Sequence, residues 1–139
     1  MVMPSVEKAK NQRPHVFAVN TSLDVLVMLR EFLQEEQYRV TITHFDVETF
    51  DQIAALGPSL LVIDLAVGEQ LGWDLLERLK TEASTTAIPV IMLSTSPQLL
   101  EQAQADPSRF GGQGFLQKPF DLNELLEMAN DLTGSASDV

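Results

Sequence analysis

The sequence predicts a single doubly wound α/β domain, in which one parallel sheet of five strands carries helices on both faces. Two observations carry this prediction. Short apolar stretches alternate with longer amphipathic segments from about residue 14 to residue 132. In addition, residues 60–63 are apolar without alternation, which is typical of a strand that is covered on both faces. The expected architecture is therefore a (βα)5 sandwich.

The expected strands are the short apolar stretches. The first is residues 15–19, and the second, residues 39–43, alternates and is rich in β-branched side chains, which favours a place near an edge of the sheet. The third, residues 60–63, is continuously apolar, the fourth is residues 88–93, and the fifth is residues 115–117.

The first two expected helices follow the first two strands. A hydroxyl at Thr21 or Ser22 can cap the first helix, which runs to about Gln37. The second helix spans residues 45–56, and Gly57 followed by proline stops it.

Three further helices complete the alternation. The third starts near Gly72, and the fourth opens at Ser96 and Pro97 with a capping hydroxyl and a proline in its first turn. Asp106 followed by proline should end the fourth helix, and Asp121 caps the last one. The apolar stripes of the third and last helices are Gly72, Leu75, Leu76 and Leu79, and Leu122, Leu125, Leu126 and Ala129.

The composition limits the classes of function. The chain of 139 residues suits one domain, with residues 1–13 as a flexible leader, 14–133 as the folded part and 134–139 as a flexible tail. The formal net charge of −11 argues against nucleic acid and against an anionic membrane as partners. The sequence has no cysteine, no signal pattern and no apolar run that could span a bilayer, which fits a cytoplasmic location.

Polar side chains follow the ends of three expected strands. Asp64 closes the third strand, Ser94 closes the fourth and Lys118 follows the fifth. The carboxyl ends of parallel strands meet at one edge of the sheet, so we expect these groups to lie together. The loop after the first strand, residues 20–22, belongs to the same edge. A carboxylate, a hydroxyl and an ammonium at one place indicate a site that handles an anionic group.

At this point the chain resembles the receiver domain of two-component response regulators. The resemblance covers about residues 14–132 and is carried by residues 61–65 with 72–76, by residues 88–94 and by residues 114–120, which include the Lys118-Pro119 pair. It implies the flavodoxin-like fold of CheY. It also implies a signalling module rather than an enzyme.

The resemblance implies a role for each site residue. Asp64 would accept a phosphoryl group, Ser94 would hydrogen-bond the phosphoryl oxygens, and Lys118 would pair with the phosphoryl group or with Asp64. Ser94 and Phe115 would form the switch, because Phe115 occupies the place of an aromatic ring that rotates when the hydroxyl moves. The Lys118-Pro119 peptide bond would be cis.

One departure from the family pattern affects the metal. The family carries two acidic residues after the first strand, which hold Mg²⁺ together with the acceptor carboxylate, whereas this sequence has Asn20 and Thr21 there. Mg²⁺ requires oxygen ligands in near-octahedral geometry, and Asp24 or Glu69 could replace the lost carboxylates only in part. We therefore expect a weak Mg²⁺ site, with Asp64 as a doubtful metal ligand. A second departure is the segment 106–112, which is about two residues longer than the family norm.

Three functions follow, in order of preference. The first is a weakly phosphorylated or phosphorylation-independent module that binds other proteins, and the second is a normally phosphorylated receiver with an unusual metal site. The third is a flavodoxin-like small enzyme or carrier, which would need a phosphate-cradling loop that residues 20–22 do not provide. The expected partner is a sensor histidine kinase or a downstream signalling protein, and residues 97–132 are the expected surface for it or for a homodimer.

Overall fold

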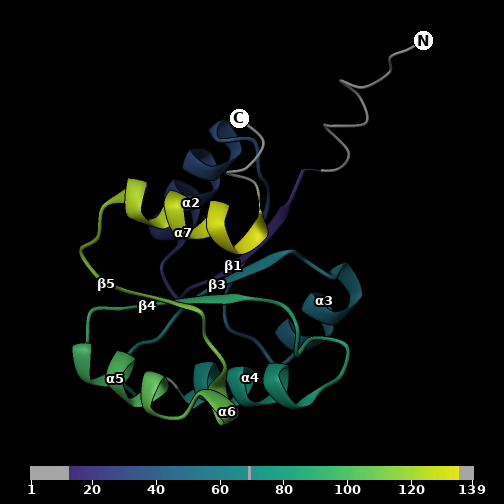
Figure 1. Cartoon of the computed structure of the whole chain (residues 1–139), viewed down its shortest axis with the longest axis vertical. Helices are drawn as coiled ribbons and strands as arrows, with labels where there is room; N and C mark the ends of the chain where they lie inside the picture. The colour runs from purple at the N-terminus through teal and green to yellow at the C-terminus, as the bar shows by residue number, and fades with distance from the viewer. Residues whose placement is uncertain (1–12, 69, 135–139) are drawn as a thin grey trace.

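The computed structural model describes residues 13–68 and 70–134, and these form one parallel sheet with the strand order β2-β1-β3-β4-β5 (Figure 1). The strands are β1 (His15–Val19), β2 (Arg39–Thr43), β3 (Leu60–Asp64), β4 (Val90–Ser94) and β5 (Gly114–Gln117). The predicted five-stranded parallel sheet is therefore confirmed, as is the place of the second strand at an edge. The expected leader and tail lie almost entirely outside the described residues.

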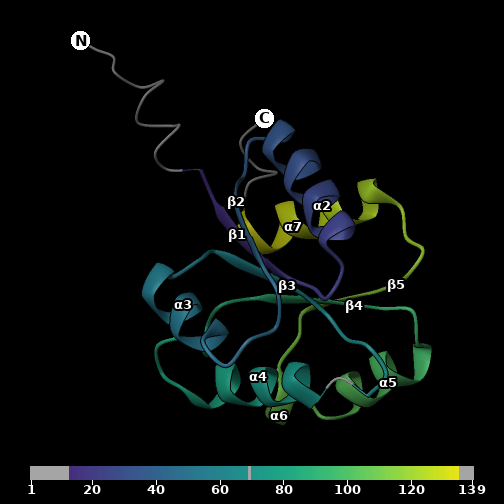
Figure 2. The same cartoon turned by 180° about the vertical axis from the view of Figure 1, so that it is seen from behind.

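Helices cover both faces of this sheet, as predicted. They are α2 (Leu23–Glu35), α3 (Thr49–Leu56), α4 (Gln70–Thr81), α5 (Pro97–Ala105), α6 (Pro107–Phe110) and α7 (Leu122–Thr133). Helices α2 and α7 lie on one face, and α3, α4 and α5 lie on the other (Figures 1 and 2). No helix in the described part of the chain is long and apolar enough to cross a membrane.

The alternation of side chains along each strand divides the core in two. In β3, Leu60 and Val62 belong to the cluster under α2 and α7, whereas Leu61 and Ile63 belong to the cluster under α3, α4 and α5. Every residue of β3 and β4 is buried. The two layers explain why these strands are continuously apolar instead of alternating.

The capping residues act as the sequence predicts. The Ser22 hydroxyl accepts a hydrogen bond from Val25 N at the start of α2, which selects Ser22 over Thr21 as the cap. The Ser96 hydroxyl does the same for Leu99 N in α5, and the Asp121 carboxylate accepts from Asn123 N at the start of α7. These caps place the loops at the carboxyl edge of the sheet next to helix starts.

Several predicted boundaries are wrong by two or more residues. Helix α2 ends at Glu35 rather than near residue 37, because Gln37 takes a left-handed conformation with φ of 77° before β2. Helix α3 begins at Thr49 rather than at residue 45, because Asp46 and Thr49 form a turn in which Asp46 N donates to Thr49 Oγ1.

Two further boundaries differ in the same way. Helix α4 begins at Gln70, ahead of the expected Gly72, and its predicted buried stripe is confirmed. Strand β4 begins at Val90 rather than at residue 88, because Ile88 N donates to Thr85 O in the preceding turn.

The short helix α6 was not predicted. Asp106 does end α5, but the proline after it opens another helical turn, and this turn is the longer segment noted in the sequence. Helix α6 packs beside α4: the rings of Trp73 and Phe110 meet edge to face at 4.8 Å, and Arg109 pairs with Glu77. Helix α6 therefore packs against α4 immediately before the chain enters β5.

Candidate functional site

The predicted site residues lie at the carboxyl edge of the sheet. Asp64 ends β3 and pairs in register with Leu93, and Ser94 ends β4 and pairs with Gln117, which precedes Lys118. On the other side of β3, Val19 pairs with Ile63, so Asn20 follows the strand beside Asp64. The strand register alone thus brings four chain segments to one place.

An ion pair between Asp64 and Lys118 forms the centre of the site. Lys118 Nζ lies 2.6 Å from Asp64 Oδ1, and the Asp64 and Lys118 side chains are 6% and 20% exposed. Lys118 Nζ is close enough to donate to Oδ1, which has no other partner among the described residues. A buried carboxylate needs a cation nearby, and Lys118 supplies it.

Backbone contacts hold Lys118 at this place. Its main-chain N–H donates to Ser94 O at 2.8 Å, which continues the pairing of β4 and β5 by one residue. The peptide bond between Lys118 and Pro119 is cis. The bond to Ser94 O places the backbone of Lys118 at the end of β5, from which its ammonium reaches Asp64.

Ser94 is turned toward the loop that follows Asp64. Its hydroxyl is fully buried, donates to Leu65 O at 2.6 Å and accepts from Ser96 N at 3.0 Å. Ser94 alternates with Leu93 in β4 and so belongs with Met92 to the sheet face of α4 and α5, whereas Asp64 belongs with Val62 to the opposite face. A hydroxyl has one hydrogen to donate, so Ser94 could donate to an oxygen beside Asp64 only after releasing Leu65.

Asn20 presents an amide where the family pattern has a carboxylate. The residue is 1% exposed, and its Oδ1 accepts a hydrogen bond from Ser22 N at 2.9 Å. Because that N–H requires an acceptor, the bond assigns the oxygen to the loop and leaves Nδ2 as the free end of the amide. Nδ2 is buried and has no hydrogen-bond partner within the described residues. Thr21 is exposed.

This donor set does not fit Mg²⁺. The ion prefers several oxygen ligands, carboxylates above all. Here the Asp64 carboxylate is already paired with an ammonium, and the Asn20 oxygen is bound to Ser22. Asp24 lies exposed in the first turn of α2, and Glu69 lies outside the described residues. Across residues 13–68 and 70–134, no three acidic, histidine or cysteine side chains gather to hold a metal.

Phe115, the other expected switch residue, is half-buried against the core on the α4 and α5 side. It pairs with Met92 in register. A methyl group on Gly112 would meet both the Phe115 ring and the Met92 side chain at 2.8 Å. The ring therefore sits directly against the backbone of the chain that enters β5.

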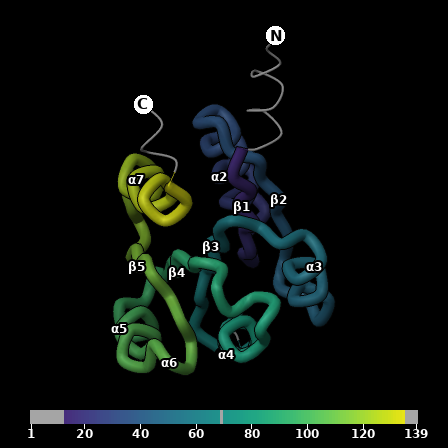
Figure 3. The backbone as a smooth tube through the Cα atoms, turned by 45° about the vertical axis from the view of Figure 1, so that its right-hand side comes forward, coloured from purple at the N-terminus to yellow at the C-terminus, as the bar shows by residue number. Residues whose placement is uncertain are grey.

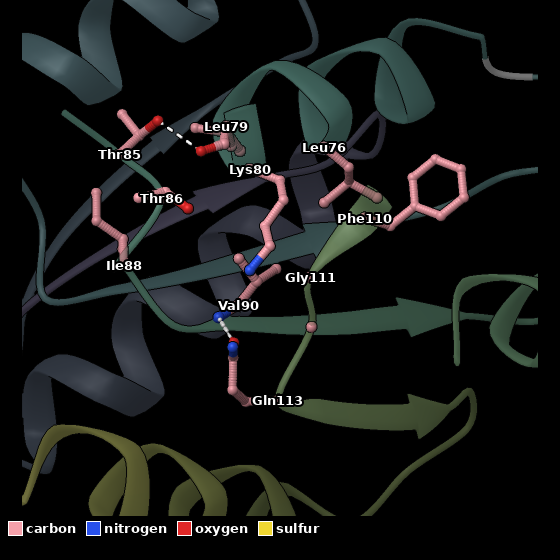
Figure 4. A pocket seen from close by; sticks show the side chains of 11 residues that line it. Leu76, Leu79, Lys80, Thr85, Thr86, Ile88, Val90, Phe110, Gly111 and Gln113 are labelled. Carbon is pink, nitrogen blue, oxygen red and sulfur yellow. Dashed lines mark hydrogen bonds between the residues drawn. The ribbon is translucent and has the colours of Figure 1, made fainter. Parts of the chain in front are cut away.

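A small hollow lies at the edge of the sheet opposite Asp64. It is bounded by α4, by residues 85–90 and by residues 110–113, with Lys80 extending into it (Figure 4). Thr85 Oγ1 donates to Leu79 O, and Val90 N donates to the Gln113 side chain, so its walls are already bonded to one another. The space is about 10 Å³, which suffices for no more than one water molecule.

Some partners in the site carry no signal in the sequence. The acceptor for Ser94 is the backbone oxygen of Leu65, and the donor to Asn20 is the backbone N–H of Ser22. Backbone groups are the same in every residue, so no residue type could have marked them. The strand ends, in contrast, were marked by polar residues after apolar stretches.

Comparisons with known proteins identify the family of the chain. The family model described as "Response regulator receiver domain" matches residues 16–130. The chain therefore belongs to the receiver domain family of two-component response regulators, as the sequence predicted.

Two curated relatives show the range of similarity. The "Two-component response regulator ORR3" of Oryza sativa subsp. indica is 26% identical over 129 residues, which cover 91% of this chain and 95% of the relative. The "Uncharacterized transcriptional regulatory protein YkoG" of Bacillus subtilis is 30% identical over 115 residues, covering 83% of this chain but only 49% of the relative. The chain thus spans nearly the whole of one relative and about half of the other.

Solved structures share the fold. The receiver domain of the Francisella response regulator 1452 superposes with a TM-score of 0.75 at 23% identity, covering 89% of this chain and 99% of that one. The chemotaxis protein CheY4 of Vibrio cholerae gives a TM-score of 0.74 at 22% identity, covering 86% and 98% of the two chains. The predicted CheY-like, flavodoxin-like fold is confirmed.

Proposed function

We propose that this receiver domain has Asp64 as its phosphoacceptor position but is phosphorylated weakly or not at all, and that it signals through contacts with other proteins. One observation carries the proposal: the residue beside Asp64 is a buried amide whose oxygen is already bonded to Ser22. The place where a divalent ion would need carboxylate oxygen is thus occupied by an amide with a free N–H₂ group.

The chemistry of phosphoryl transfer explains why the loss of a metal site would slow the phosphorylation of Asp64. Phosphoryl transfer to Asp64 would form a bond from a carboxylate oxygen to phosphorus while the bond to the donor's leaving group breaks. The transferred group spreads negative charge over three oxygens, and catalysis consists mostly of neutralising that charge. Mg²⁺ would supply that neutralisation when bound. Without it, Lys118 is the cation nearest to Asp64 among the described residues, and its charge is already balanced by the carboxylate.

Ser94 and Phe115 are proposed as the switch. In this structure the Ser94 hydroxyl holds the Leu65 carbonyl of the loop after β3. An acceptor that drew the hydroxyl toward Asp64 would release that loop and leave space near β4, into which the neighbouring Phe115 ring could turn. The same switch could be set by a bound protein that favours one position of the loop, since a partner shifts a two-state equilibrium by its difference in affinity.

The labelling of Asp64 tests the proposal. We expect incubation with acetyl phosphate and Mg²⁺ to give little or no acyl phosphate, measured by intact mass, and we expect Asp64→Ala to remove whatever label forms. Rapid and complete labelling that Asp64→Ala abolishes would favour the alternative, a normally phosphorylated receiver with an unusual metal site. That alternative is supported by the intact Asp64–Lys118 pair.

The partner is proposed to be another protein, either a sensor histidine kinase or a downstream signalling protein, met in the cytoplasm. Its surface is proposed to lie on α5, β5 and α7, which form one side of the molecule (Figure 3). Glu101, Glu124, Glu127 and Asp131 lie on α5 and α7, and neither helix contains a lysine or an arginine. This charge favours a partner with a basic surface over a second copy of the chain.

A further inference from the structure

We propose that residues 1–12, which lie outside the described part of the chain, bind as an extended strand along the free edge of β2 and fill the hollow beside it. β2 and β5 are the two edge strands of the sheet, so this site lies away from the surface on α5, β5 and α7 that is proposed for a protein partner. Docking of this segment goes beyond the proposed function and needs no phosphorylation of Asp64. Its support is the bare edge of β2, the hollow, the place where the described chain begins and the pattern of the first residues.

The free edge of β2 lacks the features that usually protect an edge strand. Unpaired backbone groups at a sheet edge attract other strands, and natural edges are kept short, carry lysine or proline, or are covered by another segment. The other edge strand, β5, has four residues, begins with Gly114 and is followed closely by Pro119. In contrast, β2 has five residues, four of them β-branched, with Arg39 as its single charge. β2 is therefore the edge that needs a covering segment.

The hydrogen bonds of β2 show which of its backbone groups are unpaired. Its first and last residues, Arg39 and Thr43, hydrogen-bond to the chain of β1. Alternate residues of a strand direct their backbone groups to the same side, so Thr41 also faces β1. The N–H and C=O groups of Val40 and Ile42 therefore point to the free side, where no strand lies among the described residues. A strand added at this edge would bond to these two residues.

A hollow of about 350 Å³ lies beside this edge, on the face of the sheet that carries α3. Its floor is formed by Phe17 with the side chains of Thr41 and Thr43, since Phe17 pairs in register with Thr41 and belongs to the core cluster of that face. Its wall is the second half of α3, where Leu56 is 50% exposed. Apolar side chains of an added strand would cover Leu56 if they lay on this face.

The described chain begins beside the amino end of β2. Arg39 Nε donates a hydrogen bond to Arg13 O at 3.0 Å. A segment that leaves this point toward residue 1 and follows β2 runs antiparallel to it. Twelve extended residues reach about 40 Å, whereas the step across β2 takes about 10 Å and the five residues of β2 span about 17 Å. Residues 1–12 are therefore long enough to cover the whole edge.

The alternation of the first residues fits an antiparallel strand at this edge. In an extended segment Val2, Pro4 and Val6 share one face, and residues 3, 5 and 7 share the other. With the apolar face in the hollow, the even-numbered residues direct their backbone to solvent, and the odd-numbered residues bond to Val40 and Ile42. Pro4, which has no N–H, thereby takes a position at which an edge strand needs none.

The charge of the segment also fits the site. Residues 1–12 contain Lys8, Lys10 and one glutamate, which gives them a net positive charge in a chain of −11. Helix α3 contains Asp51 and no basic residue, and Glu48 precedes it. Opposite charge favours this segment, rather than a second copy of the acidic folded part, as the occupant of the edge.

Amide hydrogen exchange of the full chain, followed by NMR, tests the proposal. In the wild type we expect the N–H groups of Val40 and Ile42 to be protected, although no strand in the described part of the chain bonds to them. The double variant Pro4→Ser, Ser5→Pro has the same composition but places the proline where the segment must donate to β2. Both amides should then exchange at least about tenfold faster. The Thr41 amide, which faces β1, should not change and serves as the reference within the same sample.

A second pair of variants tests the hollow. Val6→Asp places a charge among Phe17 and the end of α3, so it should expose Val40 and Ile42 as the exchanged proline does. Val6→Ile keeps an apolar side chain at the same position and should keep the protection.

Three results would overturn the proposal. The first is rapid exchange of Val40 and Ile42 in the wild type, and the second is protection that Val6→Asp and the exchanged proline leave unchanged. The third is protection that rises with protein concentration, which would assign the edge to a second copy of the chain. The labelling of Asp64 has no bearing on these results, so the docking of residues 1–12 and the proposed function can fail independently.

Discussion

Asp64 is a buried carboxylate, and among residues 13–68 and 70–134 its one ion-pair partner is Lys118, at 2.6 Å. Removal of one member of a buried ion pair is costly because the other charge stays in a poorly solvated place. We expect Lys118→Met to lower the free energy of unfolding by about 2 kcal/mol near neutral pH, since the Lys118 side chain is partly exposed and water screens part of the effect. The measurement is urea unfolding.

The matched control is the same change in a chain without the charge. In an Asp64→Asn background, Lys118→Met should cost much less, because no carboxylate is left unpaired. Equal costs in the two backgrounds would show that the stem of Lys118, and not its charge, is what the fold needs.

At the scale of elements, the chain that enters β5 is constrained by Gly112. Its φ is 91°, and an added Cβ would meet Met92 and Phe115 at 2.8 Å. We expect Gly112→Ala to lower the free energy of unfolding by more than about 2 kcal/mol, since both backbone strain and overpacking act. Gly57→Ala is the control, because Gly57 has φ of 55° with no atom within 4 Å, and it should cost about 1 kcal/mol. Similar costs at the two positions would contradict the crowding of Phe115.

We expect the stability of the fold to depend on pH through His15, which begins β1 beside β2. Partial burial, together with the charge of Arg39, lowers the pKa of His15 from its ordinary value of 6.5, and its Nε2 lies 2.7 Å from Thr41 Oγ1. The folded state thus prefers the neutral ring, so His15 stabilises fully above the unfolded pKa and loses that contribution as pH falls below it. We expect unfolding free energy to fall more between about pH 7.5 and about pH 5.5 in the wild type than in His15→Gln. Parallel falls in urea unfolding would exclude this role.

An element can be predicted from the sequence when the interactions that form it lie within the element or its neighbouring turn. The apolar stretches of β3 and β4 are set by burial on both faces, and the caps at Ser22 and Ser96 are bonds within one turn, so the sequence predicts them. The turn at Gln37 is held by local backbone bonds, from Gln37 N to Gln34 O and from Tyr38 N to Leu33 O, but its left-handed residue is not the glycine that usually marks such a helix end. The extra helix α6 depends on packing against a distant segment, as in the contact of Phe110 with Trp73. Such contacts have no local pattern.

The candidate site divides in the same way. The convergence of Asp64 and Lys118 follows from the strand order of a parallel sheet and could be predicted from strand ends. The direction of the Ser94 hydroxyl could not be predicted from the sequence, because its acceptor is a backbone oxygen in the loop after β3. The same holds for Asn20, whose role depends on which end of its amide meets Ser22.

At the scale of the whole molecule, the net charge of −11 shapes association. A symmetric dimer through residues 97–132 would bring the acidic helices α5 and α7 of two copies together, and like charges oppose such contact. We expect sedimentation equilibrium at low salt to give a monomer. A dimer that persists at all salt concentrations would contradict the preference for a partner with a basic surface. As a control, Glu124→Lys should weaken binding to that basic partner.

The central claim is that Asn20 and Thr21 deprive Asp64 of the metal that would drive its phosphorylation. The most direct measurement compares the wild type with the double variant Asn20→Asp, Thr21→Asp, both incubated with acetyl phosphate and followed by intact mass. We expect the double variant to form the acyl phosphate at least about tenfold faster than the wild type, and only with Mg²⁺ present. A wild-type chain that is labelled as fast as the double variant in Mg²⁺ would contradict it.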